Sequence, residues 1–544
     1  MHPNGVVFQS GTVYFPAMTK DRRTNLLAAA LVFLAAAAFY WHTLGFGFVW
    51  DDYAVIVHNQ GVRSLDGALG RFVEERGGAG SAYDPSELNL HNYRPLRTLA
   101  HAVVFRCVGL DPRWFHALNV AAHALACALL LLLLLRLVGS LPGALCGALF
   151  FAFHPVNTEV VCWAKEFEDS LAAAFLLSSF LLLLAGEGRA GRPRWLLFAG
   201  AMLCYALALL SKQSVVFFPL FLALCWALWR RGRWRRWGLA ALATGGLAAA
   251  GVAVSSWVVG SVAQGGYLTG DFWTTILSMP RVLLRYARLE LAPAGLLADY
   301  QDFPRAAGLD DLRAWAFAAA FLAVFAALTW LFHKARALEG WLWFCCALLP
   351  FSNLVAMVQL GAERFLYLPT IGFAWVFAAV VAKWPLPGRL WRWLPAALLL
   401  ALALVAWQRS WVWADELELW RATAAQAPDA ERPRENLVKA CLRAGLPEEA
   451  LREAADLVRR HPEPRCGNLY AYVLFENGRF EPSLAILGRN GAHDVLNMLG
   501  ARAVELKRPD LARRCFAAAC GLAPGNLSYR HNLGLLEKQF PALK

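Results

Sequence analysis

The sequence predicts a mainly α-helical membrane protein, in which a polytopic helical domain is followed by a C-terminal α-solenoid of tetratricopeptide repeats. Of its 544 residues, 58% are hydrophobic and only 17% are charged, and the mean hydropathy is +0.43. A soluble chain of this length would not carry so much apolar surface. Long apolar runs separated by short basic loops predict the membrane domain, and a sequence repeat near the C-terminus predicts the solenoid.

About eleven apolar runs are candidates for membrane spans, although several are shorter than a comfortable bilayer crossing of roughly 20 residues. They are 25–45, 115–135, 141–153, 170–185, 195–210, 215–229, 237–259, 312–332, 338–360, 365–381 and 394–407. The 23 Trp residues fit this class, because indole rings favour the membrane interface.

The basic residues of the short loops predict the orientation. With the N-terminus in the cytoplasm, most of them lie inside: Lys20, Arg22, Arg23, Arg136, Arg189, Arg192, Arg194, Arg230, Arg231, Arg233, Arg235, Arg236, Lys334, Arg336, Lys383, Arg389 and Arg392. The opposite loops hold chiefly Lys165, Lys212 and Arg364. This asymmetry is the positive-inside pattern, and it places the region after the last span outside the cytoplasm.

Three regions follow from this reading. Residues 1–23 are a cytoplasmic N-terminus, residues 24–407 are the membrane domain with outer loops at about 46–113 and 260–311, and residues 408–544 are an extracytoplasmic domain. The net charge of +13 is placed in loops between apolar runs, which indicates membrane lipids and no nucleic acid as partners. Frequent Ala, Leu and Arg are typical of a GC-rich bacterium, so the expected location is the inner (plasma) membrane.

The C-terminal region repeats. Leu499-Gly500 recurs as Leu533-Gly534, 34 residues later, which is the period of a tetratricopeptide repeat. Between them, small, aromatic, small and proline residues occupy the positions that the repeat requires: Ala512, Phe516, Ala519 and Pro524. Such helix pairs bury their apolar faces only by stacking on their neighbours, and a generic helical domain is the alternative.

The first candidate for chemistry is the acid pair Asp51-Asp52, which comes just after the first apolar run. Carboxylates beside hydrocarbon are expensive, which suggests a function. One could act as a general base while the other orients it or binds the acceptor, because two close carboxylates need not titrate alike. Alternatively, the pair caps or solvates a loop at the membrane surface.

Other polar motifs lie at the outer edges of apolar runs. They include Tyr93 and Arg94 in a Tyr-Arg-Pro-Leu sequence, His116 with Asn119 and His123 at helical spacing, His154 and Glu159 in His-Pro-Val-Asn-Thr-Glu, Asp169 at the end of a charged stretch, and Glu363. These side chains either line a water-filled cavity or form hydrogen bonds between helices. Lys165, Lys212 and Arg364 each put a cation at an outer edge, where it binds a phosphate or anchors its helix at the headgroups. Arg364 is the better phosphate ligand of the three, because a guanidinium binds two oxygens at once.

Together these motifs resemble the transmembrane and tetratricopeptide repeat-containing O-mannosyltransferases and their bacterial relatives, of the GT-C class of membrane glycosyltransferases. The shared pattern is Asp-Asp after the first span, Tyr-Arg-Pro-Leu, Phe-His-x-x-Asn, His-Pro-x-x-Thr-Glu, Leu-Ser-Lys and Glu-Arg-x-Leu-Tyr-Leu-Pro. The segment 280–304, with Tyr286 and Asp299, is similar to the family's middle outer segment. The resemblance covers most of residues 24–544.

The resemblance implies an inverting glycosyltransferase that moves a sugar, mannose by the family's name, from a polyprenyl-phosphate donor to a hydroxyl of a protein acceptor outside the cytoplasm. Asp51 and Asp52 become the catalytic pair, and Arg364, Lys212 and Lys165 the donor-phosphate ligands. The scheme needs no cofactor and leaves room for a divalent metal. Two other functions fit the sequence: a membrane-anchored scaffold whose repeats recruit partners, and a transferase with a glycan acceptor.

The chain departs from the family pattern in two places. Relatives commonly carry a basic residue two positions before the acid that matches Asp169, and Phe167 stands there in this sequence. Asn157 occupies a position of the His-Pro motif that is often a second His in relatives. Four cysteines would lie outside the cytoplasm, where they could oxidise, with no pairing assigned: Cys441, Cys466, Cys515 and Cys520.

Overall fold

The computed structural model describes residues 22–70, 72, 93–187, 190–228, 234–259, 266–300, 303, 305–357, 359–383 and 393–541. Every regular element within these ranges is a helix, which confirms the predicted mainly α class. The N-terminal region 1–23 lies outside the described residues except for its last two positions. Several basic residues used to predict the orientation also lie outside them: Lys20, Arg189, Arg230, Arg231, Arg233, Arg389 and Arg392.

The described chain divides into two compact units, a membrane unit that ends at Asp415 and a C-terminal unit that begins at Glu416. The predicted boundary fell eight residues earlier, after 407, because the last apolar run ends there. The helix itself continues through Gln408, Arg409 and Ser410 to Trp411.

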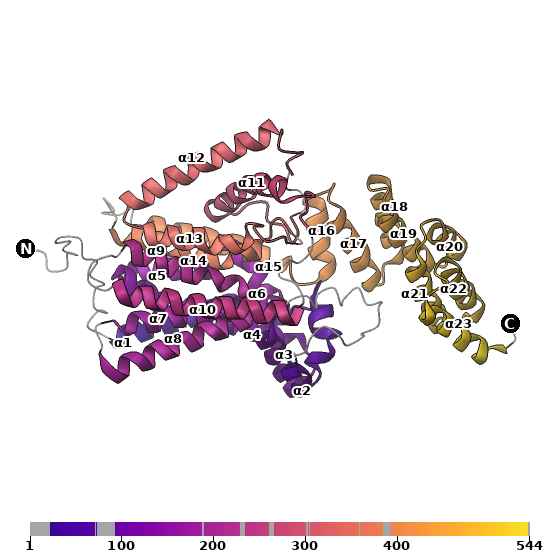
Figure 1. Cartoon of the computed structure of the whole chain (residues 1–544), viewed down its shortest axis with the longest axis horizontal. Helices are drawn as coiled ribbons and strands as arrows, with labels where there is room; N and C mark the ends of the chain where they lie inside the picture. Colours follow the sequence, from indigo (N-terminus) through magenta and orange to yellow (C-terminus); the bar gives the residue numbers. More distant parts are fainter. Residues whose placement is uncertain are drawn as a thin grey trace, which may run out of the picture. The chain divides into compact units, whose positions relative to one another are not determined.

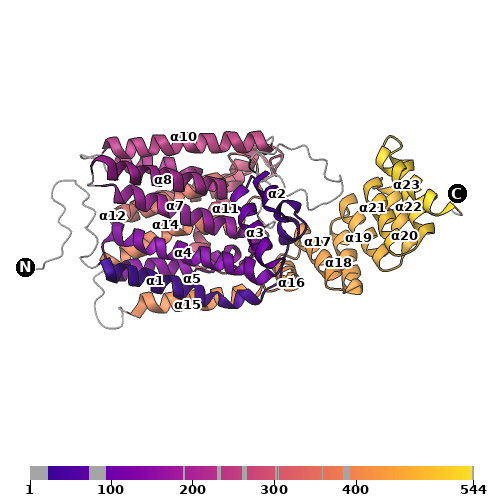
Figure 2. The ribbon, with the colours of Figure 1, turned by 90° about the horizontal axis from the view of Figure 1, so that it is seen from below.

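The membrane unit is a bundle of long apolar helices (Figures 1 and 2). They are α1 (Arg22–Phe39), α4 (Pro112–Val138), α5 (Leu141–Phe153), α7 (Phe167–Ala185), α8 (Gly191–Ser211), α9 (Phe218–Leu228), α10 (Trp234–Val259), α12 (Leu312–Lys334), α13 (Leu338–Leu348), α14 (Tyr367–Lys383) and α15 (Leu394–Trp411). In Figure 2, α4, α7, α8 and α10 lie along one another, and each packs against the next. The helical conformation itself pairs the backbone N–H and C=O groups within each segment, as a membrane requires.

Eight helices in the described residues are long and apolar enough to cross a membrane, and a ninth span results if the pair Leu141–Phe153 and Pro155–Cys162, bent by 48°, is one crossing. Two shorter apolar helices cover Gln213–Leu228 and Leu338–Phe351. Each of the eleven predicted runs coincides with one of these helices. The run 338–360 is shorter than predicted, because Pro350 lacks the N–H needed to continue the helix and the helical structure stops at Phe351.

Small residues allow a close helix contact between α5 and α14. A Cβ on Gly143 or Gly147 would lie 2.6 Å from a carbonyl oxygen of α14. Their Gly-x-x-x-Gly spacing puts both glycines on one face, which lets two membrane helices approach closely. Elsewhere large aromatic rings fill the space, for example Phe180, Phe221 and Trp343, whose ring centroids lie 5.0–6.1 Å apart in contacting pairs.

The two predicted outer loops contain helices of their own. The first carries α2 (Leu65–Gly70) and α3 (Pro95–Val108), and the second carries α11 (Phe272–Leu291). Within α11, Arg281, Arg285 and Arg288 recur at helical spacing between apolar residues, so the helix is amphipathic and was missed by a search for uniformly apolar runs.

The C-terminal unit is built of eight consecutive helices: α16 (Glu416–Gln426), α17 (Glu431–Arg443), α18 (Pro447–Arg460), α19 (Pro464–Glu476), α20 (Phe480–Arg489), α21 (His493–Glu505), α22 (Pro509–Leu522) and α23 (Leu527–Gln539). Each packs against the next along the chain. The helix pair expected for 493–526 is α21 and α22. A Cβ on Gly500 would lie 2.6 Å from the Phe516 ring, which explains why this position of the motif is Gly.

Candidate active site

Asp51 and Asp52 occupy a short loop between the 3₁₀ helix Trp41–Gly45 and the π-helical turn Tyr53–Val57. The preceding residue, Trp50, has a φ of +50°, a left-handed conformation that is strained for a bulky side chain. Its indole stacks on that of Trp163, with centroids 4.6 Å apart and planes 5° from parallel. The stack holds the loop against the segment that leads into α7.

The two carboxylates have different surroundings. Asp52 is completely buried and accepts hydrogen bonds from two backbone N–H groups, that of Val49 at 3.0 Å and that of Lys165 at 2.8 Å. The bond from Lys165 connects the acid loop with the segment before α7 across 113 residues of sequence. Burial raises the pKa of Asp52 to about 8, against the opposing influence of the two N–H donors and the Lys165 ammonium.

Asp51 is the accessible member of the pair, with 21% of its side-chain surface exposed. Its Oδ2 lies 3.0 Å from Lys165 Nζ, and this ammonium also lies 4.4 Å from the centroid of the Trp163 ring. Asp51 therefore has a charged partner and access to solvent, which a proton acceptor needs, whereas Asp52 is enclosed in the backbone of the loop.

Asn119 of α4 fixes the turn that carries Trp163 and Lys165. Its Nδ2 donates to the carbonyl oxygens of Val160 at 2.7 Å and Trp163 at 2.9 Å, and its Oδ1 accepts from Ser170 Oγ at 3.1 Å. His123, one turn later, contacts Tyr367 Oη at 2.8 Å. Both side chains thus form hydrogen bonds between segments of the bundle and do not line a water-filled cavity, which were the two alternatives that the sequence left open.

The start of α7 is the centre of a buried ionic network. Lys165 lies 3.3 Å from Glu166, and Lys212, at the end of α8, pairs with Glu166 at 3.1 Å and with Asp169. Glu168 accepts from two arginines that flank the start of α3, Arg94 at 3.3 Å and Arg97 at 2.6 Å. The network brings side chains of α3, α7 and α8 to one end of the bundle.

Arg364 joins the same network from the turn before α14. Its Nη1 lies 2.5 Å from Glu159 Oε1, and its backbone N–H donates to the other oxygen of Glu159 at 2.9 Å. The guanidinium also lies 3.6 Å from Glu166. Arg364 is therefore already paired with carboxylates in this structure, although the sequence indicated it as a phosphate ligand.

Charge within the network is nearly balanced. Five cations form ion pairs with five carboxylates: Arg94, Arg97, Lys165, Lys212 and Arg364 with Asp51, Glu159, Glu166, Glu168 and Asp169. Buried charges persist only when they are paired and hydrogen-bonded. An entering anion must therefore replace one of these carboxylates as a partner of a cation.

Four sequence candidates lie outside this network. Tyr93 donates to the Phe72 carbonyl at 3.1 Å, and His116 contacts the Gly47 carbonyl at 3.2 Å, at the entrance of the acid loop. His154 contacts the Glu290 carbonyl at 3.2 Å. Glu363 binds Tyr300 Oη at 2.9 Å and Arg409 at 3.3 Å. His154 and Glu363 thereby support the outer segments and not the acid pair.

Three network members were absent from the sequence-predicted site: Glu166, Glu168 and Arg97. Glu166 and Glu168 stand next to the chosen Lys165 and Asp169 in one charged motif, and Arg97 follows the chosen Arg94 by three residues, so local charge density was the available signal. Phe167 is buried against the ring of His101 with centroids 6.0 Å apart. The side chains of Arg94 and Arg97 reach the neighbouring Glu168.

His101 of α3 is completely buried, and neither ring nitrogen has a hydrogen-bond partner in the described part of the chain. Its ring also packs edge-on against Phe115 at 5.4 Å. Burial lowers the pKa of His101 to about 3, and the Arg97 guanidinium adds to this effect. The imidazole is thus neutral and packs as an aromatic ring.

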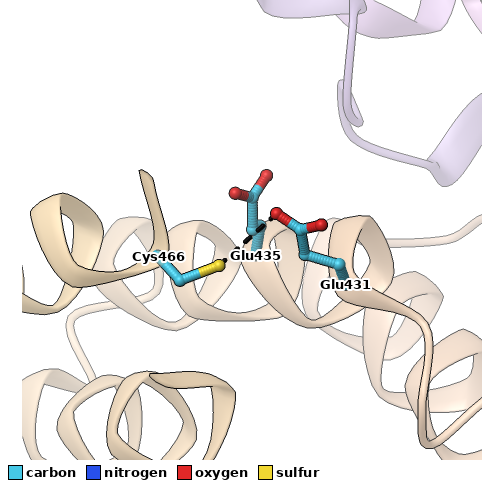
Figure 3. A group of neighbouring side chains, drawn as sticks. All are labelled: Glu431, Glu435 and Cys466. Atoms are coloured by element: carbon cyan, nitrogen blue, oxygen red, sulfur yellow. Dashed lines mark hydrogen bonds between the residues drawn. The ribbon is translucent and has the colours of Figure 1, made fainter. Parts of the chain in front are cut away.

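One group of side chains in the C-terminal unit has donor atoms close enough for a metal ion. In Figure 3, Glu431 and Glu435 of α17 face Cys466 of α19, and their ligand atoms all lie within 4.8 Å of one another. The thiol donates to Glu431 at 3.4 Å, and Arg465 forms an ion pair with Glu435. These contacts explain the group without an ion.

The four cysteines that could have formed disulfides are free thiols: Cys441, Cys466, Cys515 and Cys520. Cys466 shows how the fold accommodates them, since its thiol is buried and burial raises its pKa to about 12. A thiol with so high a pKa is a poor nucleophile.

Comparison with known proteins bears on the function of this site. The human protein O-mannosyl-transferase TMTC3 is 26% identical over 190 residues, which are 35% of this chain and 20% of the relative. Human TMTC1 is 32% identical over 158 residues, 28% of this chain and 17% of the relative. The Caenorhabditis elegans protein O-mannosyl-transferase F38B6.6 is 25% identical over 434 residues, 78% of this chain and 61% of the relative. No family model matches the chain.

The chain is similar to the protein O-mannosyl-transferases of animals. This finding confirms the resemblance that the motifs indicated. The matched segment spans about a fifth of the human relatives' length. The nematode alignment is longer than the whole C-terminal unit, so the similarity includes much of the membrane unit and is not confined to helical repeats.

Proposed function

We propose that the protein is a membrane glycosyltransferase that moves a sugar, mannose by analogy with its relatives, from a polyprenyl-phosphate donor to a hydroxyl group of a protein. Transfer takes place on the extracytoplasmic side, with the N-terminus in the cytoplasm and the C-terminal unit outside. The observation that carries the proposal is the accessible Asp51 carboxylate beside Lys165, at the edge of a buried network of paired cations.

In the proposed reaction, Asp51 takes the proton of the acceptor hydroxyl while the hydroxyl oxygen attacks the anomeric carbon. The bond from that carbon to the phosphate oxygen breaks on the opposite face, so the configuration inverts and the electron pair leaves with the polyprenyl phosphate. Lys165 is the cation nearest to Asp51 and lies on the side of the attack, while Arg364, with Lys212, stabilises the charge of the leaving phosphate. Asp52 positions the loop and does not touch the substrate.

The repeats supply the protein acceptor site in this proposal. Asn497 of α21 and Asn532 of α23 lie side by side, with Nδ2 of Asn532 donating to Oδ1 of Asn497 at 3.0 Å. A side-chain amide offers a donor and an acceptor together, the combination that an extended peptide backbone requires. A double substitution to Ala should raise KM for a protein acceptor and leave donor hydrolysis unchanged. An unaltered KM would argue for a glycan acceptor.

The decisive experiment is the transfer of labelled sugar by purified protein in nanodiscs. Asp51→Asn should lower kcat by roughly 10²–10⁴-fold, the usual contribution of a general base, and should leave the melting temperature unchanged. Asp66→Asn, in the exposed helix α2 of the same outer loop, is the matched control and should keep full activity. Full activity of Asp51→Asn would refute the assignment and favour the scaffold function.

Two further measurements test the donor and the location. Mass spectrometry of gently purified protein should find a bound polyprenyl-phosphate sugar, and its identity gives the sugar. An alkaline phosphatase fused after residue 544 is active only outside the cytoplasm, so we expect an active fusion. An inactive phosphatase together with an active cytoplasmic reporter would overturn the proposed orientation.

A further inference from the structure

An open pocket lies at the other end of the bundle from the ionic network, where α7 ends and where α8 and α10 begin. Helix α7 connects the two places, because Asp169 is in its first turn and the pocket residues Leu182 and Leu183 are in its last. At 1.5 Å per residue, some 20 Å of helix separates them. The pocket is therefore distinct from the candidate active site.

Two arginines line this pocket, Arg194 of α8 and Arg236 of α10. Neither forms an ion pair with any carboxylate in the described ranges, whereas the five cations of the ionic network are all paired. Glu187 also lines the pocket, and its Oε1 accepts a hydrogen bond from the Trp237 indole at 3.1 Å. Two guanidinium groups and a single carboxylate give the pocket a net positive charge.

The remaining wall is apolar and aromatic. Leu182 of α7 and Phe198 of α8 line it together with the indoles of Trp195 and Trp237. Trp237 is buried, while Trp195 is 54% exposed and carries the Arg194 guanidinium 5.4 Å from its ring centroid. Exposed indoles at the ends of membrane helices lie at the headgroup level of a bilayer. A cationic rim above an apolar wall at this depth matches the two parts of a phospholipid.

We propose that this pocket binds an anionic phospholipid, with Arg194 and Arg236 holding the headgroup phosphate and an acyl chain lying against Leu182 and Phe198. Guanidinium groups bind phosphate oxygens in pairs, and basic pockets between membrane helices are suited to anionic headgroups. The inference concerns the membrane unit alone and does not depend on the glycosyltransferase proposal. The outcome of the Asp51 experiments therefore neither supports nor weakens the proposed lipid site.

The test measures the thermal stability of the full-length protein in a neutral detergent while lipid is added. Phosphatidylglycerol should raise the melting temperature with a saturable dependence on concentration, because a ligand that binds only the folded state stabilises it. Phosphatidylcholine and inorganic phosphate at the same concentrations should raise it far less. In Arg194→Gln with Arg236→Gln, the half-saturating concentration of phosphatidylglycerol should increase at least tenfold.

Arg192→Gln is the matched control, since Arg192 is exposed on the same helix α8 and does not line the pocket. It should keep the wild-type response. If the double variant is poorly folded, Arg236→Gln alone, at an exposed position, should still increase the half-saturating concentration. An unchanged response in these variants, or equal stabilisation by phosphatidylcholine, would overturn the proposal. Equal stabilisation by inorganic phosphate would show a free-anion site and no lipid site.

Discussion

Replacing Asp52 should destabilise the protein, whereas replacing Asp51 should not, although the two residues are adjacent. Asp52→Ala leaves the N–H groups of Val49 and Lys165 without their acceptor, in a place that solvent does not reach. An unsatisfied buried donor costs about 1–3 kcal/mol, so the loss is about 2–6 kcal/mol. In Asp52→Asn, the amide oxygen still accepts one of these hydrogen bonds, but the NH2 group faces the other N–H and cannot accept. We therefore expect about half of that loss in the free energy of unfolding.

The pH dependence of this difference follows from the raised pKa of Asp52. A carboxyl group with a pKa of about 8 in the folded protein and about 3.9 in the unfolded chain binds its proton more tightly when folded. Its stabilising contribution is therefore complete below about pH 4 and is lost as the pH rises through 8. The difference in the free energy of unfolding between wild type and Asp52→Ala should decrease by about 1.4 kcal/mol between pH 7 and pH 9.

The assay is thermal or denaturant unfolding of the purified protein in detergent, with sugar transfer measured on the same samples. We expect the order wild type equal to Asp51→Asn, then Asp52→Asn, then Asp52→Ala in stability. In activity, Asp51→Asn should be the most impaired of the variants that remain folded. A wild-type melting curve for Asp52→Ala, or a strongly lowered one for Asp51→Asn, would refute the division of roles between the two carboxylates.

Two other substitutions test the surroundings of the acid pair. His101→Phe should remove part of the acid sensitivity of the fold, because the pKa of His101 is lowered in the folded protein. The stabilising effect of the neutral imidazole is complete above pH 6.5 and is lost as the pH falls below it. Between pH 7.5 and pH 5, the free energy of unfolding of the variant should therefore rise by about 2 kcal/mol relative to that of wild type. A pH dependence equal to that of wild type would contradict the burial of a neutral imidazole. Lys165→Gln should lower kcat for transfer more than it raises KM for the donor, measured by initial rates, whereas a change in KM alone would assign Lys165 to ground-state binding.

The helices could be predicted because a membrane span is a composition signal that needs no partner. Leu, Ala and Phe over 17–27 residues mark α4 or α14 whatever packs against them. The amphipathic α11 lacked that signal, since Arg281 and Arg285 interrupt the apolar run of its sequence. The early end of the helix at Phe351 depended on one residue, Pro350, inside an otherwise apolar run.

The candidate site could be predicted as a set of residues but not as a set of pairs. Its ion pairs connect positions as far apart as Arg364 and Glu159, which are separated by 205 residues, and no local pattern encodes such contacts. The different surroundings of Asp51 and Asp52 could not be predicted from the sequence either. Consecutive side chains on a tight turn point in different directions, and only the fold decides which one meets the backbone of the α7 segment and which one meets solvent.

The balanced charges of the network bear on how the proposed reaction would proceed. Lys165 is shared between Asp51 at 3.0 Å and Glu166 at 3.3 Å. When Asp51 takes the acceptor proton it loses its negative charge, and in the same step the departing phosphate gains one. Because Lys165 also contacts Glu166, its buried ammonium keeps an anionic partner when Asp51 becomes neutral, and an unpaired charge, which would be costly at low dielectric, does not arise. Arg364, held by two bonds to Glu159, has no partner that changes charge in this step. This asymmetry assigns Lys165 to the proton transfer at Asp51 and leaves Arg364 for the phosphate on the opposite face of the sugar.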